Sequence, residues 1–379
     1  MTEFIRRRTV NAKNDILSGI TVALALVPEA VAFSFVAGVD PLVGLYAAFM
    51  IGLITSIFGG RPGMISGATG ALAVVMVALV AKGNAMGVEG EQLGLYYLFA
   101  TVILMGFIQM LAGFFKLGKF VRLIPHSVMM GFVNGLAIVI FLSQLGMFIT
   151  IENGEEVWMH GTQLWIMIGL VALTMGIMFG LPKVTKKVPE ALLAILVVSA
   201  IVIFGKLDVA TVGSFIREGG GEGLKGGLPQ FQFDIFSKVP FNMETLFFIG
   251  PYALILAAIG LIESLMTLNL IDDLTETRGN TNRECLAQGG ANIVTGLFGG
   301  MGGCAMIGQS IINIKGGGRG RLSGIVAALA LLGFILFASG LIEQVPIAAL
   351  VGVMFMVVIG TFAWSSFRIM NKIPRTDVF

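Results

Sequence analysis

Apolar runs long enough to cross a lipid bilayer recur along almost the whole of this sequence. A transmembrane helix needs about 20 mostly apolar residues to span roughly 30 Å of hydrocarbon. Runs of this kind, some of them shorter, lie at 15–37, 42–58, 64–82, 93–115, 126–149, 163–181, 188–206, 244–271, 286–300, 304–314, 322–342 and 346–367. Only 12% of the 379 residues are charged, against roughly a quarter in soluble domains. The sequence therefore predicts an all-α polytopic membrane protein with about twelve spans.

Two of these runs, 64–82 and 304–314, depart from the pattern of a continuous helix. The first opens on small residues between Gly63 and Gly70, and the second is too short to cross the bilayer. Interrupted segments of this kind form the binding sites of secondary transporters. We expect each to be an extended stretch with a short strand, followed by a half-helix.

Basic residues cluster in every second loop. If the N-terminus is cytoplasmic, the cytoplasmic loops carry Arg61; Lys116, Lys119 and Arg122; Lys183, Lys186 and Lys187; Arg278 and Arg283; Lys315, Arg319 and Arg321; and Lys372 and Arg375. The opposite loops carry Glu89, Glu91, Glu152, Glu155, Glu156 and Glu343. Because cytoplasmic loops hold an excess of Lys and Arg, the pattern predicts a multi-pass protein of the plasma (inner) membrane with a cytoplasmic N-terminus.

A nine-residue pattern at the end of the second run returns at the end of the ninth. Residues 52–60 read Gly-Leu-Ile-Thr-Ser-Ile-Phe-Gly-Gly and residues 292–300 read Asn-Ile-Val-Thr-Gly-Leu-Phe-Gly-Gly, so the shared phenylalanines are 298 − 58 = 240 residues apart. The copies are an odd number of spans apart, which places them in opposite orientations across the membrane. This is the inverted-topology repeat of secondary transporters.

The repeat and the loop charges divide the chain into segments. We expect a cytoplasmic N-terminal segment at 1–14, a first repeat of seven spans at 15–206, an extracellular or periplasmic loop at 207–243, an incomplete second repeat at 244–367 and a cytoplasmic tail end at 368–379.

The inverted arrangement would bring the N-termini of both half-helices to the middle of the membrane. Unpaired backbone N–H groups and two positive dipole ends then meet there, which suits an anion without a fixed positive side chain. The expected donors are the backbone of Thr69, Gly70 and Ala71 and that of Met306, Ile307 and Gly308, with the Thr69 hydroxyl, Gln309 and Ser310 nearby. The alternative is that these small and polar residues only pack helices.

Two carboxylates lie inside predicted spans, where they are costly and usually functional. Glu29 follows Pro28 in the first run and Glu263 lies in the eighth, at corresponding places of the two repeats. Either could carry a coupling proton, or Glu263 with Thr69 and Thr267 could supply oxygen ligands to Na⁺. The alternative is a carboxylate that hydrogen-bonds across helices and fixes their packing.

Other patterns exclude several functions. No Ser/His/Asp or Cys/His arrangement indicates an enzyme, no basic face indicates nucleic acid, and no motif indicates a cofactor or a structural metal. Cys285 and Cys304 have no metal or redox spacing, and we expect both to pack as small apolar residues. The glycine-rich segment 315–321 lacks the spacing of a phosphate-binding loop and is better explained as a turn with cytoplasmic basic anchors.

Several motifs together resemble the sulfate permease (SulP) family of anion transporters. They are Val-Pro-Glu-Ala-Val-Ala-Phe at 27–33, Gly-Leu-Ile-Glu-Ser-Leu at 260–265, Asn-Arg-Glu at 282–284, Gln-Gly at 288–289 with Ala-Asn at 291–292, Gly-Leu-Phe-Gly-Gly at 296–300 and Arg-Gly-Arg-Leu-Ser-Gly at 319–324. The similarity runs over nearly the whole chain and points to a bacterial member.

The resemblance implies a 7+7 inverted-repeat fold made of a core domain and a gate domain. It implies elevator-like alternating access, commonly in a homodimer, and most members also carry a cytoplasmic STAS domain. This chain reaches Phe379 where the last two gate spans would begin. We therefore expect those spans and the STAS domain to lie outside it.

The resemblance also implies site residues. The family's anion pocket falls on Phe33, on Thr69 and on the turn from Met306 to Gln309, where many animal members have Arg at the position of Gln309. Proton-coupled bacterial relatives use a carboxylate at the position of Glu29. Sodium-coupled bicarbonate members have Asp at the position of Glu263 and Thr near Ile307, which this chain lacks.

The leading hypothesis is a secondary active transporter of small inorganic or carboxylate anions, of the sulfate, bicarbonate or dicarboxylate class, coupled to H⁺. A nucleobase transporter of the same architecture stays open because Glu263 could bind a base. An anion channel is the third reading, and it would differ by its large unitary currents.

Overall fold

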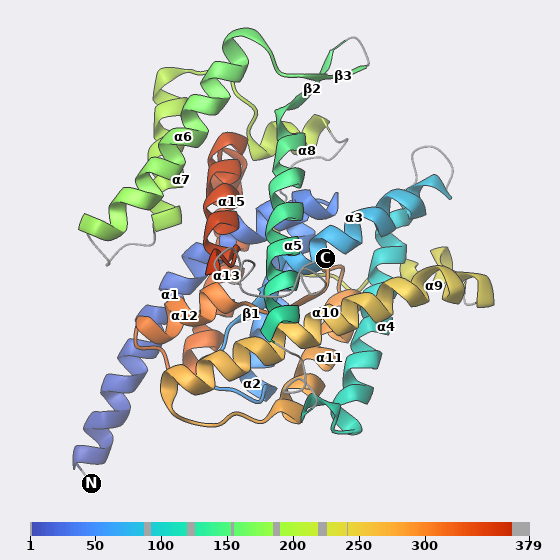
Figure 1. Cartoon of the computed structure of the whole chain (residues 1–379), viewed down its shortest axis with the longest axis vertical. Coiled ribbons are helices and arrows are strands. Elements are labelled where there is room, and N and C mark those ends of the chain that lie inside the picture. The colour runs from blue at the N-terminus through green and yellow to red at the C-terminus, as the bar shows by residue number, and fades with distance from the viewer. Residues whose placement is uncertain are drawn as a thin grey trace.

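The computed structural model describes residues 2–86, 92–119, 126–152, 155–184, 190–218, 226–240 and 242–365. It is built almost entirely of helices, with two small pairs of strands (Figure 1). Several residues of the predicted loops lie outside the described residues: Glu89, Glu91, Arg122, Lys186 and Lys187, and the predicted tail end from 368 to 379.

The first half of the chain follows the predicted runs closely. Its helices are α1 (Thr2–Ala37), α2 (Pro41–Phe58), α3 (Gly70–Ala85), α4 (Leu93–Phe114), α5 (His126–Leu145), α6 (Gly161–Val184) and α7 (Glu190–Gly205). Strand β1 (Ser66–Ala68) precedes α3, and the 3₁₀ turn η2 (Gly146–Phe148) leads into the hairpin β2 (Ile149–Glu152) and β3 (Glu155–Trp158). Residues 2–14, expected as a separate segment, continue α1.

The second half begins with a region predicted only as a loop. Residues 207–243 contain two short helices, α8 (Val212–Glu218) and α9 (Asp234–Lys238). The remaining elements are α10 (Met243–Thr275), α11 (Thr281–Leu297), β4 (Gly303–Ala305), α12 (Ile307–Lys315), α13 (Arg321–Phe337), α14 (Ser339–Glu343) and α15 (Ile347–Thr361). The predicted run 322–342 is therefore two helices, α13 and α14.

Five helices in the described part of the chain are long and apolar enough to cross a membrane. They are the Ala12–Ala37 part of α1, α2, α4, the Gly161–Lys183 part of α6, and α10. Helices α3, α7, α13 and α15 are apolar but have 15 to 17 residues, and α12 has 9. The helices thus lie where the sequence predicted apolar runs. Several of them, however, are too short to cross a membrane as a single helix.

Glycines interrupt the chain where the two matching nine-residue patterns end. Gly63 has φ +81° and Gly299 has φ +78°, in the left-handed region that side chains with a Cβ rarely adopt. After each break the chain runs extended and then starts a half-helix. The expectation of a strand followed by a half-helix is therefore confirmed in both repeats.

Strands β1 and β4 pair with each other, although they come from opposite halves of the chain. The pairing is antiparallel and joins Ser66 to Ala305, Gly67 to Cys304 and Ala68 to Gly303. The starts of the two strands are 303 − 66 = 237 residues apart, three fewer than the 240 that separate Phe58 and Phe298. The second connection is thus three residues shorter, and Met306 rather than Gln309 corresponds to Thr69.

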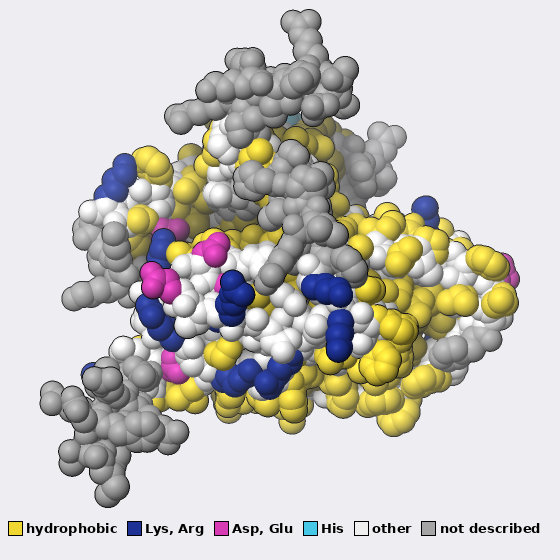
Figure 2. Space-filling model, turned by 60° about the horizontal axis from the view of Figure 1, so that its bottom comes forward, with side chains coloured by type: hydrophobic (Ala, Val, Ile, Leu, Met, Phe, Trp, Pro, Cys, Tyr) yellow, Lys and Arg dark blue, Asp and Glu magenta, His cyan; other side chains and the backbone are white. Residues whose placement is uncertain are grey.

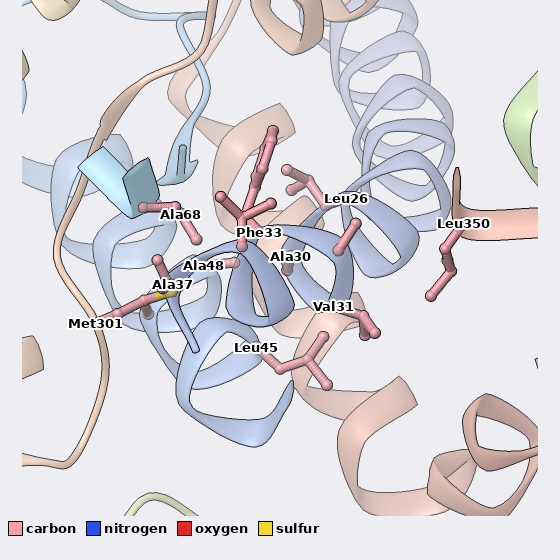
Figure 3. Close-up of a cluster of buried hydrophobic side chains, with 14 of the residues drawn as sticks. Leu26, Ala30, Val31, Phe33, Ala37, Leu45, Ala48, Ala68, Met301 and Leu350 are labelled. Carbon is pink, nitrogen blue, oxygen red and sulfur yellow. The ribbon is translucent and has the colours of Figure 1, made fainter. Parts of the chain in front are cut away.

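The helices fall into two groups that meet along α1. Helix α11 packs against α4 and α2, α1 packs against α13, and α1, α2 and α10 pack against the paired strands. Helices α5, α6, α7 and α15 pack on one another at the other side (Figure 1). Side chains of α1, among them Leu26, Ala30 and Phe33, fill the buried cluster together with Ala48 of α2 and Leu350 of α15 (Figure 3).

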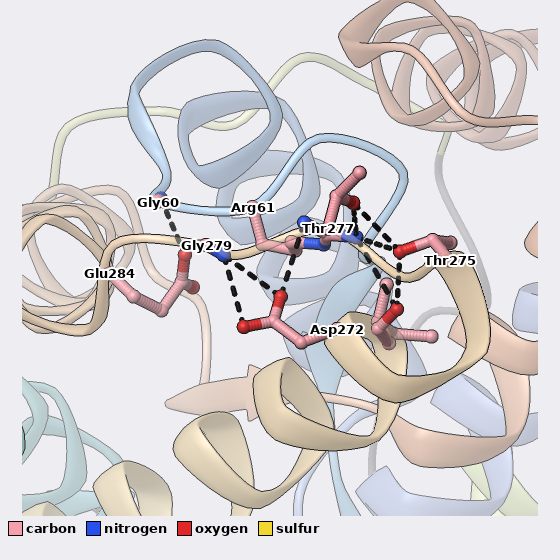
Figure 4. Close-up of polar contacts among 8 residues, drawn as sticks. Gly60, Arg61, Asp272, Thr275, Thr277, Gly279 and Glu284 are labelled. Atoms are coloured by element: carbon pink, nitrogen blue, oxygen red, sulfur yellow. Dashed lines mark hydrogen bonds and ion pairs between the residues drawn. The ribbon is translucent and has the colours of Figure 1, made fainter.

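A polar network fixes the end of α2 to the connection between α10 and α11. Nη1 of Arg61 lies 3.1 Å from Oδ1 of Asp272, and its Nη2 donates to Thr275 and to Thr277 (Figure 4). Buried Glu284 accepts a hydrogen bond of 2.7 Å from the Gly60 N–H. Asp272 and Glu284 therefore order the first glycine-rich break.

The last carbonyls of α2 are capped by two arginines from the second repeat. Nη1 of Arg321 donates to the carbonyls of Ser56 and Ile57 at 2.9 Å, and Nε of Arg283 donates to that of Phe58 at 2.8 Å. Cations at a helix C-terminus satisfy carbonyls that have no intrahelical donor and complement the helix dipole. Figure 2 turns this end of the molecule toward the viewer and shows Lys and Arg side chains with hydrophobic side chains around them.

Candidate functional site

A cavity of about 400 Å³ lies where the two half-helices begin. Its walls come from both groups of helices: α1, α3, α10 and α12 on one side, α5 and α15 on the other. The lining residues predicted from the sequence are Glu29, Phe33, Thr69, Gly70, Ala71, Glu263, Met306, Ile307, Gly308 and Gln309. The structure thus brings together residues that are up to 280 positions apart.

The N-terminus of α3 is closely covered. Thr69 is the N-cap residue, is only 3% exposed, and does not cap the helix with its own side chain. A Cβ added at Gly70 would lie 2.7 Å from Cε1 of Phe33 and 2.9 Å from Cδ1 of Ile140. A methyl group here would therefore force Phe33 or Ile140 to shift, because the Phe33 ring lies against the first turn of α3.

The N-terminus of α12 is open by comparison. Met306 is its N-cap residue, and nothing lies within 4 Å of a Cβ built on Gly308. The N–H of Met306 donates to the carbonyl of Ile65, so the orientation of this turn is fixed by the β1 segment. The first N–H groups of α3 and of α12 have no partner within their own helices and both border the cavity.

The two carboxylates of the cavity lie on different helices. Glu29 of α1 lines the cavity together with Gln309 of α12. Oε2 of Glu263 accepts from Sγ of Cys304 at 3.0 Å, and that sulfur lies 3.3 Å from the Thr69 hydroxyl. The expectation that Cys304 only packs as an apolar residue was therefore wrong, because its thiol joins a carboxylate of α10 to the cap of α3.

Cys285 and two predicted site residues lie away from the cavity. Cys285 packs among apolar side chains, as expected. The Ser310 hydroxyl accepts from the N–H of Ile65 at 3.0 Å, behind the cavity wall. Thr267 donates to the carbonyl of Glu263 at 2.8 Å. Ser310 and Thr267 hold the backbone of the half-helix region and do not line the cavity.

The electrostatic character of the cavity comes from dipoles and carboxylates. Among the described residues that line it there is no Lys, Arg or His. Positive potential is therefore supplied by the two half-helix ends, each equivalent to roughly half an elementary charge. An anion placed between them also faces Glu29 and Glu263, so its binding depends on whether these groups are ionised.

The sequence did not reveal the gate side of the cavity. Val133 and Ile140 of α5 and Val357, Gly360 and Thr361 of α15 form the side of the cavity opposite the half-helices. Four of these five residues are apolar or glycine and resemble every other residue of a membrane span. No motif marks them, and only the packing of α5 and α15 against the half-helices places them here.

Comparison with known proteins shows the family. A model of the sulfate permease family matches residues 13–379. The chain belongs to the sulfate permease family. The resemblance seen in its motifs is therefore confirmed, and this sulfate permease family member is an integral membrane protein.

The relatives with similar sequences are named as transporters and not as enzymes. The chain is 49% identical over 97% of its length to the putative sulfate transporter YbaR of Bacillus subtilis, of which it covers 70%. It is 33% identical to the bicarbonate transporter BicA of a Picosynechococcus strain, with 96% of the chain covering 64% of that protein. The chain thus spans about two-thirds of the length of these relatives.

Solved structures agree on the fold. The transmembrane domain of a cyanobacterial bicarbonate transporter BicA superposes with a TM-score of 0.81 and 30% identity over 95% of this chain and 91% of that one. Murine Slc26a9, described as an anion transporter in the inward-facing state, gives 0.74 with 17% identity over 95% of this chain and 62% of that one. These similarities confirm the predicted 7+7 inverted-repeat fold.

Proposed function

We propose that the chain is the membrane part of a secondary active transporter of small inorganic or carboxylate anions, of the sulfate, bicarbonate or dicarboxylate class. The observation that carries this proposal is the cavity between the half-helices. Two helix N-termini supply N–H donors to it. Its described lining residues include no Lys, Arg or His that would hold the anion permanently. A carrier must release its substrate, so this moderate, dipole-based attraction suits transport.

The coupling ion in this proposal is H⁺. An anion in the cavity is repelled by ionised Glu29 and Glu263 and is accepted more readily when they are protonated. The Na⁺ alternative has less support, because the Thr267 hydroxyl donates to backbone carbonyls and the carboxylate of Glu263 is bound to Cys304. A proton therefore enters with the anion, and the protein acts as a symporter.

The transport motion in this proposal is an elevator-like displacement of one helix group against the other. The half-helices, α1 and α10 form one wall of the cavity, while α5 and α15 form the opposite wall. Val133, Ile140 and Val357 are apolar and make no hydrogen bonds to an anion, so they offer a surface along which the other group can slide. We place the N-terminus in the cytoplasm and assign a homodimer to the assembly.

An uptake assay in proteoliposomes tests the function. The full chain is reconstituted, and uptake of sulfate, bicarbonate, chloride, fumarate and uracil is measured with the proton and sodium gradients varied separately. We expect saturable, proton-driven uptake of one of the anions. Uptake driven only by sodium would contradict the coupling, and uptake of uracil alone would replace the anion by a nucleobase. Large unitary currents would indicate a channel.

A further inference from the structure

Two further cavities lie at the ends of the helices that face away from the basic loops. One, of about 620 Å³, is lined by η2, β2, α6 and the start of α15. The other, of about 490 Å³, is lined by the connection from α1 to α2, by α3 and by the start of α4. Among the described lining residues, only Phe215 of α8 borders both cavities. Its ring therefore forms a shared wall between a cavity of each helix group.

Helix α8 is held on the group that contains α15. The N–H of Val212 donates to the carbonyl of Val345, and the N–H of Ile347 donates to that of Ala210, both at 2.9 Å. These two bonds form a short antiparallel bridge directly before α15. Helix α8, which lies near the β2–β3 hairpin in Figure 1, is therefore expected to move together with α15.

The ring of Phe215 contacts α1, which belongs to the other group. Its centroid lies 4.7 Å from that of Phe35, and the two ring planes cross at 65°. Edge-to-face contacts of this kind between aromatic rings are attractive. Phe35 lies two residues beyond Phe33 of the site cavity, close to the end of α1. The contact therefore joins the two groups on the side of the proposed anion site toward which α1 runs.

The site cavity extends in the opposite direction. Beyond the starts of the half-helices, its lining includes Met266, Ile311 and Thr361. These residues lie toward the C-terminal ends of α10, α12 and α15, which are cytoplasmic in the proposed orientation. The described lining residues of the site cavity are not shared with either of the other two cavities. The site is thus open toward the cytoplasm and separate from the outer cavities.

We propose that Phe215 and Phe35 form the outer gate of the transporter: their contact holds the helix groups together while the site is open to the cytoplasm, and it separates before the site opens outward. This inference rests on the proposed function and names the contact that the displacement of the two groups breaks. A contact that exists in one state shifts the population toward that state. Loss of the Phe215 ring therefore favours the outward-open state.

The test measures from which side of the membrane the open end of α12 can be reached. Gly308→Cys introduces a thiol at a position where a Cβ meets no other atom within 4 Å. Both native cysteines are buried, so the chain without this substitution serves as the blank. A membrane-impermeant maleimide is added to right-side-out or inside-out vesicles that contain the full chain. We expect Phe215→Ala to raise the rate of labelling from outside about fivefold and to lower the rate from inside.

A matched substitution separates gating from loss of packing. Phe231 makes a similar edge-to-face contact with Phe298, with 5.5 Å between centroids. Its segment is bonded to α11 through the Gln232 N–H and the Leu297 carbonyl, so this contact lies within one group. Phe231→Ala should leave the outside labelling rate unchanged, and Phe215→Tyr, which keeps the ring, should not raise it. An unchanged outside rate in Phe215→Ala, or an equal increase in Phe231→Ala, would overturn the proposal.

The other half of the contact gives a second variant. If Phe215→Ala does not fold, Phe35→Ala should produce the same increase in outside labelling, and an unchanged rate in Phe35→Ala would then overturn the proposal. Anion uptake by the same vesicles is measured in parallel. Wild type that takes up none of the tested anions contradicts the proposed function, whereas the labelling rates decide on the gate in either case.

Discussion

The two half-helices have the same origin in the repeat but present different ends to the cavity. The end of α3 is covered by the Phe33 ring and by Ile140 and has no room for a side chain at Gly70. The end of α12 is open at Gly308 and carries the buried Gln309 amide, whose oxygen has no hydrogen-bond partner. The comparison teaches that the α3 end sets the shape of the cavity, whereas the α12 end sets its chemistry.

The largest effect on transport is expected when the two carboxylates of the cavity, Glu29 and Glu263, are replaced in turn. Glu29→Gln should abolish proton-driven accumulation of sulfate in proteoliposomes while sulfate exchange without a gradient continues, because a neutral side chain carries no proton through the cycle. Undiminished uphill uptake by Glu29→Gln under a pH gradient would rule out this role. For Glu263→Gln, the melting temperature shows whether this carboxylate serves transport or packing, since unfolding rather than loss of transport would indicate packing.

Alanine substitutions at Gly70 and at Gly308 should have different effects on stability and on sulfate binding. Gly70→Ala should lower the free energy of unfolding by about 1–3 kcal/mol, because its methyl group overpacks against Phe33 and Ile140. Gly308→Ala should leave the unfolding temperature nearly unchanged and weaken sulfate binding, because its methyl group enters the open side of the cavity. Thermal unfolding with and without sulfate measures both quantities. Equal unfolding temperatures for the two variants would show that the ends do not differ.

A smaller effect is expected at Cys304, which lies on β4 and contacts Thr69 at the cap of α3. Cys304→Val removes the hydrogen bond to Glu263 and the contact with Thr69, and should weaken sulfate binding by about fivefold, or roughly 1 kcal/mol. Cys304→Ser keeps a donor and should retain most of the affinity. If serine and valine reduce binding equally, the hydrogen bond has no part in binding and the position is one of packing.

The smallest effect on sulfate binding is expected for Ser310, which lies on α12 behind the cavity wall. Ser310→Ala removes the acceptor of the Ile65 N–H and should cost about 0.5–1.5 kcal/mol of stability. The affinity for sulfate should stay close to that of wild type, because the Ser310 side chain does not line the cavity. A loss of affinity larger than the loss of stability would place Ser310 back in the binding site, where the sequence first suggested it.

The sequence predicted those parts of the molecule that depend on local pattern. Apolar runs gave the helices to within a few residues in most cases. Gly63 and Gly299 gave the breaks, because few other residues adopt their backbone conformation. Glu29 and Glu263 were predicted to be important because charges are costly inside a membrane. All of these inferences can be made without knowing which helices pack against each other.

Features that depend on neighbours were missed. The contact of Cys304 with Glu263 needs the strand pairing that brings the two together. The two glycine-rich patterns are 240 residues apart, but the strands and half-helices that follow them are 237 residues apart. The difference arises because the connection that leads to β4 is three residues shorter than the one that leads to β1. Apolar residues such as Val133 and Val357 carry no local signal of a site.

The pairing of β1 with β4 has a consequence for how selectivity can change. The two half-helix ends are held together by main-chain hydrogen bonds, from Ser66–Ala305 to Ala68–Gly303, so the spacing between them does not depend on the side chains that face the cavity. A substitution at Thr69, Gln309 or Glu29 therefore changes the charge or polarity offered to the substrate while the two ends remain equally far apart. A single scaffold can in this way accept anions of different shape and charge.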